Sequence, residues 1–230
     1  MRQETIVMES MEQLLRYIIK PTEGVKVIID FESMFYLTSQ LSMEAGEAAS
    51  HLLNNPILAI GSWDVSKVKN MGGMFAQAIE FNPPLNDWDV SNVTDMSYMF
   101  HNANKFNQPL NNWDVSKVTS MRGMFMEAHT FNHALNDWNV GNVRNMAGMF
   151  WDALVFNQPL NDWDVSKVRD MYIMFSRAHK FNQPLDKWNI SKVRDMTHMF
   201  NEAEEFNQSL KSWGNLRRVR TKGMYDKLVK

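Results

Sequence analysis

A tryptophan recurs in this chain every 25 residues, and this fixed spacing constrains the fold more than any other feature of the sequence. A period between about 20 and 50 residues is typical of repeat proteins, in which each unit packs against its neighbours. The sequence therefore predicts six complete units and a shortened seventh. The seven tryptophans are Trp63, Trp88, Trp113, Trp138, Trp163, Trp188 and Trp213.

Each unit joins two patterns of apolar residues, as the unit that starts at Trp113 shows. Apolar residues at 110, 113 and 115 predict the approach to a short strand whose alternate side chains face inward. Apolar residues at 121, 124, 125 and 128 have the i, i+3, i+4, i+7 spacing of one helix face. Six residues of N-cap type precede these predicted helices: Asn70, Asp95, Ser120, Asn145, Asp170 and Asp195. Each unit is thus predicted as strand, turn, capped short helix and return loop.

A helix of two or three turns is not stable alone in water, so the units must stack to share a core. We predict an α/β solenoid of 25-residue strand–turn–short-helix units with an N-terminal α/β cap. The expected divisions are a cap at residues 1–60, six repeats at 61–212 and a truncated capping repeat at 213–230. Within the cap, the apolar stripe from Val7 to Ile18 predicts a helix, "VKVIIDF" (25–31) a buried strand, and the segment from Ser42 a second helix.

The composition excludes several classes of protein. The chain has no cysteine, so it can hold neither a disulfide framework nor a cysteine zinc site. Its formal net charge of −2 gives no global field toward nucleic acid or membranes. Glu4, Glu9 and Glu12 interrupt the segment where a signal peptide needs an apolar run, and no run is long enough to cross a bilayer. We therefore expect an intracellular or virion-associated protein and not a secreted or cell-surface one.

The ionisable residues do not form a recognisable catalytic pattern. Most of the six histidines fall at different positions of the unit. His129 and His179 share a position but lie two units apart, roughly 10 Å by strand spacing, which is too far to share a metal ion. There is no phosphate-binding glycine loop and no Ser-His-Asp spacing. The sequence predicts no enzyme activity, no cofactor and no metal site.

One group of apolar residues breaks the pattern of the repeat. Met126 and Trp151 occupy the helix position that follows the phenylalanine, where the other units carry small or polar residues. Together with their neighbours they predict an apolar patch on the helix side of the third to fifth units, of the kind that marks an interface. Alternatively, Trp151 folds over Gly148 and fills a gap. The apolar patch comprises Met126, Trp151, Leu154, Val155, Tyr172 and Ile173.

A polar column is the second candidate site. It follows the tryptophans and is predicted on the outward strand face, where it could make local turns, form a recognition stripe or bind a cation. The column consists of Asp64, Asp89, Asp114, Asn139, Asp164 and Asn189. A basic edge near the carboxyl end, Arg217, Arg218 and Arg220, is either polar decoration of a terminal repeat or a phosphate-binding edge.

The unit resembles a known repeat. "FNQPLNxWDVSxVxxMxxMF" is similar to the 26-residue repeat of the BspA-like bacterial surface proteins, and the resemblance covers residues 56–212. The segment Leu110-x-x-Trp113-x-Val115-x-x-Val118 also resembles the strand of leucine-rich repeats, with valine at the usual asparagine. The resemblance implies a leucine-rich-repeat-like solenoid used for adhesion or protein binding, without enzyme activity.

These observations predict a non-enzymatic protein-binding module of scaffold or adhesion type, with a protein partner of unknown identity. One alternative is a structural component that packs against itself or a larger particle, such as a virion or an envelope. Another alternative is nucleic-acid binding through the basic carboxyl end.

Overall fold

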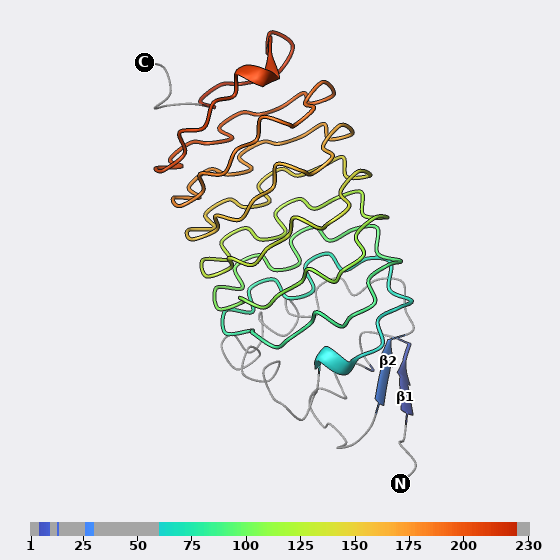
Figure 1. Ribbon diagram of the computed structural model, residues 1–230. Helices are drawn as coiled ribbons and strands as arrows, with labels where there is room; N and C mark the ends of the chain where they lie inside the picture. The colour runs from blue at the N-terminus through green and yellow to red at the C-terminus, as the bar shows by residue number, and fades with distance from the viewer. Residues whose placement is uncertain (1–4, 10–12, 14–25, 30–59, 225–230) are drawn as a thin grey trace.

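The computed structural model describes residues 5–9, 13, 26–29 and 60–224. From residue 60 onward the chain winds in successive coils that lie one on another, as Figure 1 shows. We number the coils from the first, which starts at Trp63, to the seventh, which starts at Trp213. Single parallel bridges join each coil to the next at residues 25 apart: Asn70↔Asp95, Asp95↔Ser120, Ser120↔Asn145, Asn145↔Asp170, Asp170↔Asp195 and Asp195↔Arg220.

The short helix predicted in each unit is absent from the described coils, and consecutive turns take its place. In the third coil these turns cover residues 122–127, where Gly123 and Glu127 have φ angles of 58° and 56°. Left-handed residues at this interval interrupt a right-handed helix. The N–H of Met124 still donates to the carbonyl of Met121 at 3.2 Å, which closes a four-residue turn. Such turns bury the same i, i+3, i+4 side chains that a helix would bury.

The hydrogen bonds between coils explain why turns replace the helix. The N–H of Met121 donates to the carbonyl of Asn145 at 2.9 Å, and that of Gly123 to Ala147 at 2.9 Å. The N–H of Glu127 donates to Trp151 at 2.7 Å. Alternate N–H groups therefore bind the next coil, while the others close turns within their own coil. A continuing helix would direct N–H groups of this segment to carbonyls four residues earlier in its own coil, and those bonds to the next coil would be lost.

The strand predicted near Trp113 is also replaced by turns. The N–H of Trp113 donates to Leu110 at 3.1 Å, and the N–H of Val118 donates to Val115 at 2.9 Å. The bridge to the neighbouring coils lies further along the unit, at Ser120. The sequence pattern placed the pairing position too early because turns of this kind also alternate buried and exposed side chains.

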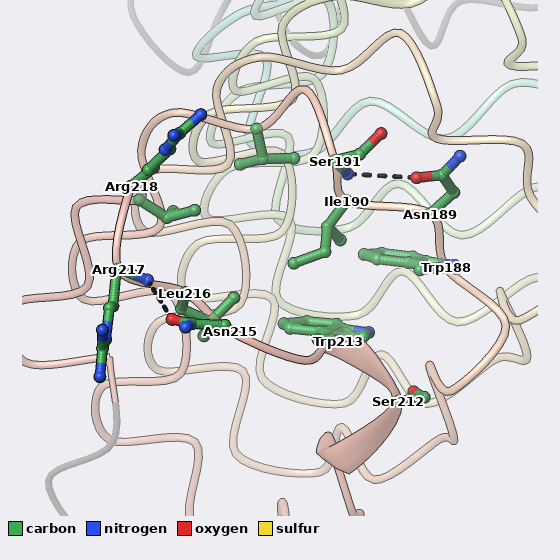
Figure 2. Close-up of a pocket in the computed structure, with 12 residues that line it drawn as sticks. Trp188, Asn189, Ile190, Ser191, Ser212, Trp213, Asn215, Leu216, Arg217 and Arg218 are labelled. Carbon is green, nitrogen blue, oxygen red and sulfur yellow. Dashed lines mark hydrogen bonds between the residues drawn. The ribbon is translucent and has the colours of Figure 1, made fainter.

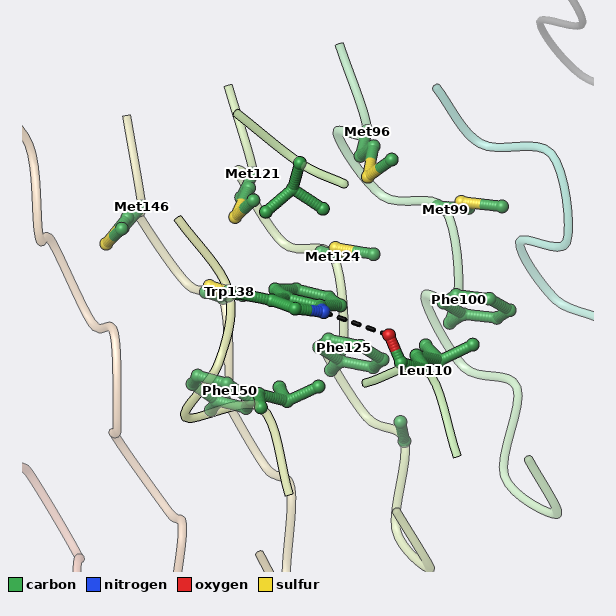
Figure 3. Packing of buried hydrophobic residues seen from close by; sticks show 14 of the residues in the cluster. Met96, Met99, Phe100, Leu110, Met121, Met124, Phe125, Trp138, Met146 and Phe150 are labelled. Carbon is green, nitrogen blue, oxygen red and sulfur yellow. Dashed lines mark hydrogen bonds between the residues drawn. The ribbon is translucent and has the colours of Figure 1, made fainter. Parts of the chain in front are cut away.

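Columns of identical side chains form the core, which Figure 3 shows for the second to fourth coils. The ring of Phe125 stacks on those of Phe100 and Phe150, with centroids 5.6 and 5.7 Å away. The indole N–H of Trp138 donates to the carbonyl of Leu110 at 3.0 Å. The equivalent bond recurs at each repeat tryptophan from Trp88 to Trp213. The buried indole groups are thus satisfied, as buried polar groups must be.

An asparagine column fixes the return loops. The side-chain oxygen of Asn82 accepts the backbone N–H of Asn107 at 2.9 Å, and the same bond links each later pair. Because every link joins residues 25 apart, the loops stack in the same register as the core.

The amino-terminal part contributes two parallel strands, β1 (Thr5–Met8) and β2 (Lys26–Ile29). β2 lies within the segment predicted as a strand, and its Ile28 bridges to Asp64 in the first coil. Val7 and Met8 were predicted in a helix but belong to β1, a segment rich in β-branched residues that favour strands. The remainder of that stripe and the helix predicted from Ser42 lie outside the described residues. Two short 3-10 helices, η2 (Ile60–Ser62) and η3 (Lys211–Trp213), precede the first coil and begin the seventh.

Replacing Gly123 with alanine should destabilise the protein by about 2–4 kcal/mol, combining a left-handed backbone penalty with overpacking. A Cβ there would lie 2.5 Å from two carbon atoms of the Tyr98 ring. The ring would have to move, which would break the bond from Arg122 Nε to Tyr98 Oη (2.5 Å). Gly148→Ala is the matched control, because its φ of 63° is similar but its nearest neighbour is the flexible end of Met126 at 2.9 Å. Urea unfolding should show a smaller loss for the control, and equal losses would contradict this account.

Candidate binding surface

The apolar patch lies on the turn segments of the third to fifth coils, and Met126 is its one member on the third coil. A Cβ built on Gly148 would lie 2.9 Å from Met126 Cε and 3.7 Å from Ile173 Cγ1. Met126 therefore covers Gly148, and Ile173 lies beside it. The alternative in which Trp151 covers Gly148 is wrong, because Met126 already occupies that space.

Trp151 faces a charged group instead of the glycine. The guanidinium carbon of Arg177 lies 6.0 Å from the centre of the indole ring, within the range of a cation–π contact. Arg177 Nε also lies 3.1 Å from Asp152 Oδ1, and Asp152 Oδ2 lies 3.1 Å from His129 Nε2. Asp152 is buried, so this ion pair is only partly screened by solvent. The half-buried tryptophan thus lies beside a chain of charged side chains from three coils.

The remaining members of the apolar patch extend it at its margins. Val155 and Tyr172 are 40% and 39% exposed, and they are two of the four large apolar side chains that are exposed in the described part of the chain. Leu154 is half-buried, and its carbonyl accepts the N–H of Lys180 at 3.2 Å. The structure thus brings Met126 and Ile173 together, directs Trp151 toward Arg177, and leaves Val155 and Tyr172 facing outward.

Sequence reasoning missed the residues that position Trp151. Arg177, Asp152 and His129 belong to three different coils, and only the stacking register brings them together. The sequence did carry a sign of Asp152 and Arg177, because the fourteenth residue after the tryptophan is polar in every complete unit. That column also has a left-handed backbone throughout: Gln77, Asn102, Glu127, Asp152, Arg177 and Glu202.

The polar column that follows the tryptophans forms local turns. The carboxylate of Asp114 accepts the N–H of Ser116 at 3.0 Å, and Asp164 accepts that of Ser166 at 3.0 Å. The hydrogen bonds from the serine hold the pKa of each carboxyl below its usual value, and a nearby lysine adds to the effect. Asn139 makes the same turn without a charge, through the N–H of Gly141 at 3.2 Å. The turn geometry therefore needs an acceptor oxygen and not a negative charge.

The acidic and imidazole groups are dispersed. Within the ranges that the structure describes, no cluster of three or more His, Asp or Glu side chains could hold a metal ion.

The basic edge divides into two parts. Arg217 and Arg218 are exposed, whereas Arg220 pairs with the carboxylate of Asp195 at 2.7 Å. A cavity of about 620 Å³ lies between the sixth and seventh coils, and Figure 2 shows Arg217 and Arg218 at one side of it. The cavity is lined on its apolar side by Trp188, Ile190, Trp213 and Leu216.

The cavity arises because the seventh coil departs from the repeat. Gly214 has φ 64° and ψ −136°, a conformation almost restricted to glycine, and it adds a residue after the tryptophan. As a result Leu216 takes the place of the first valine of the unit, and the N–H of Val219 bonds to its carbonyl at 2.9 Å.

Residues 47–161 and 133–229 both match one protein family, described as Mycoplasma protein of unknown function, DUF285. The two segments overlap and together cover most of the chain. The chain belongs to the DUF285 family. Its double match agrees with the repeated unit, and the family description names no activity. No curated protein and no solved structure matches the chain.

The described part of this DUF285 chain holds no helix with the length and apolar character that a bilayer crossing requires.

Proposed function

We propose that this chain is a non-enzymatic protein-binding module whose apolar patch holds a protein partner. Trp151 carries the proposal, because it is a large aromatic side chain that remains half-exposed at a position where the other units carry small or polar residues or Met126. Tryptophan, tyrosine and arginine are the residues that most often dominate binding energy at protein interfaces. Trp151, Tyr172 and Arg177 supply all three types on neighbouring coils.

The surroundings of Trp151 favour binding through a preformed surface. Arg177 contacts both the indole ring and the carboxylate of Asp152, and the phenylalanine columns in the same coils are buried. A side chain that is already ordered loses little conformational entropy when a partner covers it. The patch is therefore suited to a partner that docks onto a rigid surface.

For the architecture, we infer a leucine-rich-repeat-like solenoid related to the BspA-like repeat proteins, with turns where helices were predicted. The bridges between units 25 residues apart support this inference, as does the family match across most of the chain. The same inference assigns the protein a scaffold role without catalysis.

The test compares the wild-type protein with a Trp151→Ala/Tyr172→Ala variant in a pull-down from source cells. A partner identified by mass spectrometry is then measured against both purified proteins. We expect the variant to bind about tenfold or more weakly, since truncating hot-spot residues costs about 2 kcal/mol or more. Ile79→Ala is the matched control, because Ile79 is also exposed (37%) but lies in the first coil. Equal affinities for the variant and the wild type would refute the proposal.

The same variant separates partner binding from self-assembly. If the purified wild-type chain dimerises in analytical ultracentrifugation and the variant does not, the apolar patch serves the structural-assembly alternative.

A further inference from the structure

A column of arginines lies in the fourth to sixth coils, each one residue before the residue that bridges to the neighbouring coils. The backbone N–H of Arg169 donates to the carbonyl of Arg144 at 2.9 Å, and that of Arg194 donates to Arg169 at 2.8 Å. The three residues therefore lie side by side on consecutive coils, about 4.8 Å apart by ladder spacing. All three side chains are exposed. The first three coils carry Lys69, Thr94 and Thr119 at this position.

These arginines differ from several other surface cations, which are held in ion pairs. Lys187 pairs with Asp162 at 2.7 Å, and Arg220 pairs with Asp195 at 2.7 Å. Across the described residues, Arg144, Arg169 and Arg194 form no ion pair. Like charges opposite each other on a ladder repel, so this column is electrostatically unfavourable in the free protein. A bound anion would remove that repulsion.

A second basic column runs beside the first. Lys167 and Lys192 precede the arginines of their coils by two residues, and the buried Val168 and Val193 separate them. Both columns therefore face outward. Arg218 continues the second column, because the bond from Val219 to Leu216 shifts the seventh coil by one residue. We call Arg144, Lys167, Arg169, Lys192, Arg194 and Arg218 the basic strip.

The neighbouring polar column loses its acids where the basic strip begins. The first three members of this column are the acids Asp64, Asp89 and Asp114. Beside the basic strip the column carries Asn139, Asp164 and Asn189, so only one of these three residues is acidic. On the other side, the Asp170 carboxylate accepts the N–H of Tyr172 at 3.0 Å, and Asp195 is paired with Arg220. A chain with a net charge of −2 thus concentrates exposed positive charge on one face, where Lys167 and Lys192 act on the single acid Asp164.

We propose that the basic strip binds an extended acidic segment of a polypeptide. Carboxylates on one side of an extended chain recur every second residue, roughly 6.6 Å apart, and long arginine side chains can reach them from a ladder. The planar guanidinium also binds carboxylates through two hydrogen bonds. Single-stranded nucleic acid fits less well, because proteins that bind it interleave aromatic side chains with the cations, and the strip contains none. The basic strip shares no residue with the apolar patch, so this proposal does not depend on the one above.

The test measures binding of a labelled oligo-glutamate peptide of about eight residues, which spans roughly 26 Å when extended. Fluorescence anisotropy compares the wild type with an Arg144→Gln/Arg169→Gln/Arg194→Gln variant. We expect the affinity to fall about tenfold, since exposed ion pairs contribute up to about 1 kcal/mol each. The wild-type affinity should also fall as salt rises.

The matched control, Lys105→Gln/Lys180→Gln/Lys187→Gln, removes the same charge from exposed residues outside the basic strip. It should change the affinity by no more than about twofold. Equal losses in the two variants, or no binding by the wild type, would overturn the proposal. Tighter binding of an oligothymidine with the same number of charges would assign the strip to nucleic acid instead. Thermal unfolding of both variants, followed by circular dichroism, confirms that they fold.

Discussion

Deletion of one whole unit, residues 113–137, is expected to leave a folded protein that unfolds cooperatively. The deletion joins Asn112 to Trp138 and restores the sequence pattern of the unit. Every bridge between coils and every core column has the same 25-residue period, so each contact can form again with the next coil. The indole N–H of Trp138 would then bind the carbonyl of Leu85, which Trp113 binds now at 2.8 Å. Only one unit and one interface are lost.

The control removes about half a unit, residues 113–125, and joins Asn112 to Met126. This change moves every later column out of register with the preceding coil. It should place buried positions against polar ones and abolish the cooperative transition. Urea unfolding followed by circular dichroism distinguishes the two deletions. If the whole-unit deletion is as disordered as the half-unit deletion, the equivalence of the coils is contradicted.

Phe125→Ala is expected to lower the free energy of unfolding by about 3–5 kcal/mol, the range for a large buried aromatic side chain. Phe125 is fully buried, and its ring lies 4.1 Å from that of Phe131. It also stacks on Phe100 and Phe150 in the coils before and after. The substitution therefore leaves a cavity bounded by three coils, which the rigid stack cannot easily close.

Phe206→Ala is the matched control for this prediction. Phe206 is 6% exposed, and its ring contacts those of Phe200 in its own coil and Phe181 in the preceding coil. Because the stack is freer to relax near its end, the loss measured by urea unfolding should be smaller. Losses of equal size would show that the columns do not act as a continuous stack.

The candidate sites show where sequence reasoning was sufficient and where it was not. Trp151 and Met126 were identified because they depart from a strict repeat, and departures can be read from one sequence. Their contacts could not be read, because Arg177 and Ile173 reach them only through the register of neighbouring coils. The sequence predicts helix caps at the asparagines and aspartates before the turn segments. They do bind a backbone N–H, as Asp95 binds Ser97 at 2.8 Å, but within a turn.

The sequence by itself determined the length of the unit and the side chains that become buried. Burial follows from the spacing of apolar residues, and Met121, Met124, Phe125 and Ala128 are buried as their spacing requires. The tertiary structure alone decided the backbone conformation. An i, i+3, i+4 pattern is met equally by a helix and by consecutive turns, because both return the chain to one face every three or four residues. The neighbouring coil decides between them, since it accepts the alternate N–H groups that a helix would have kept.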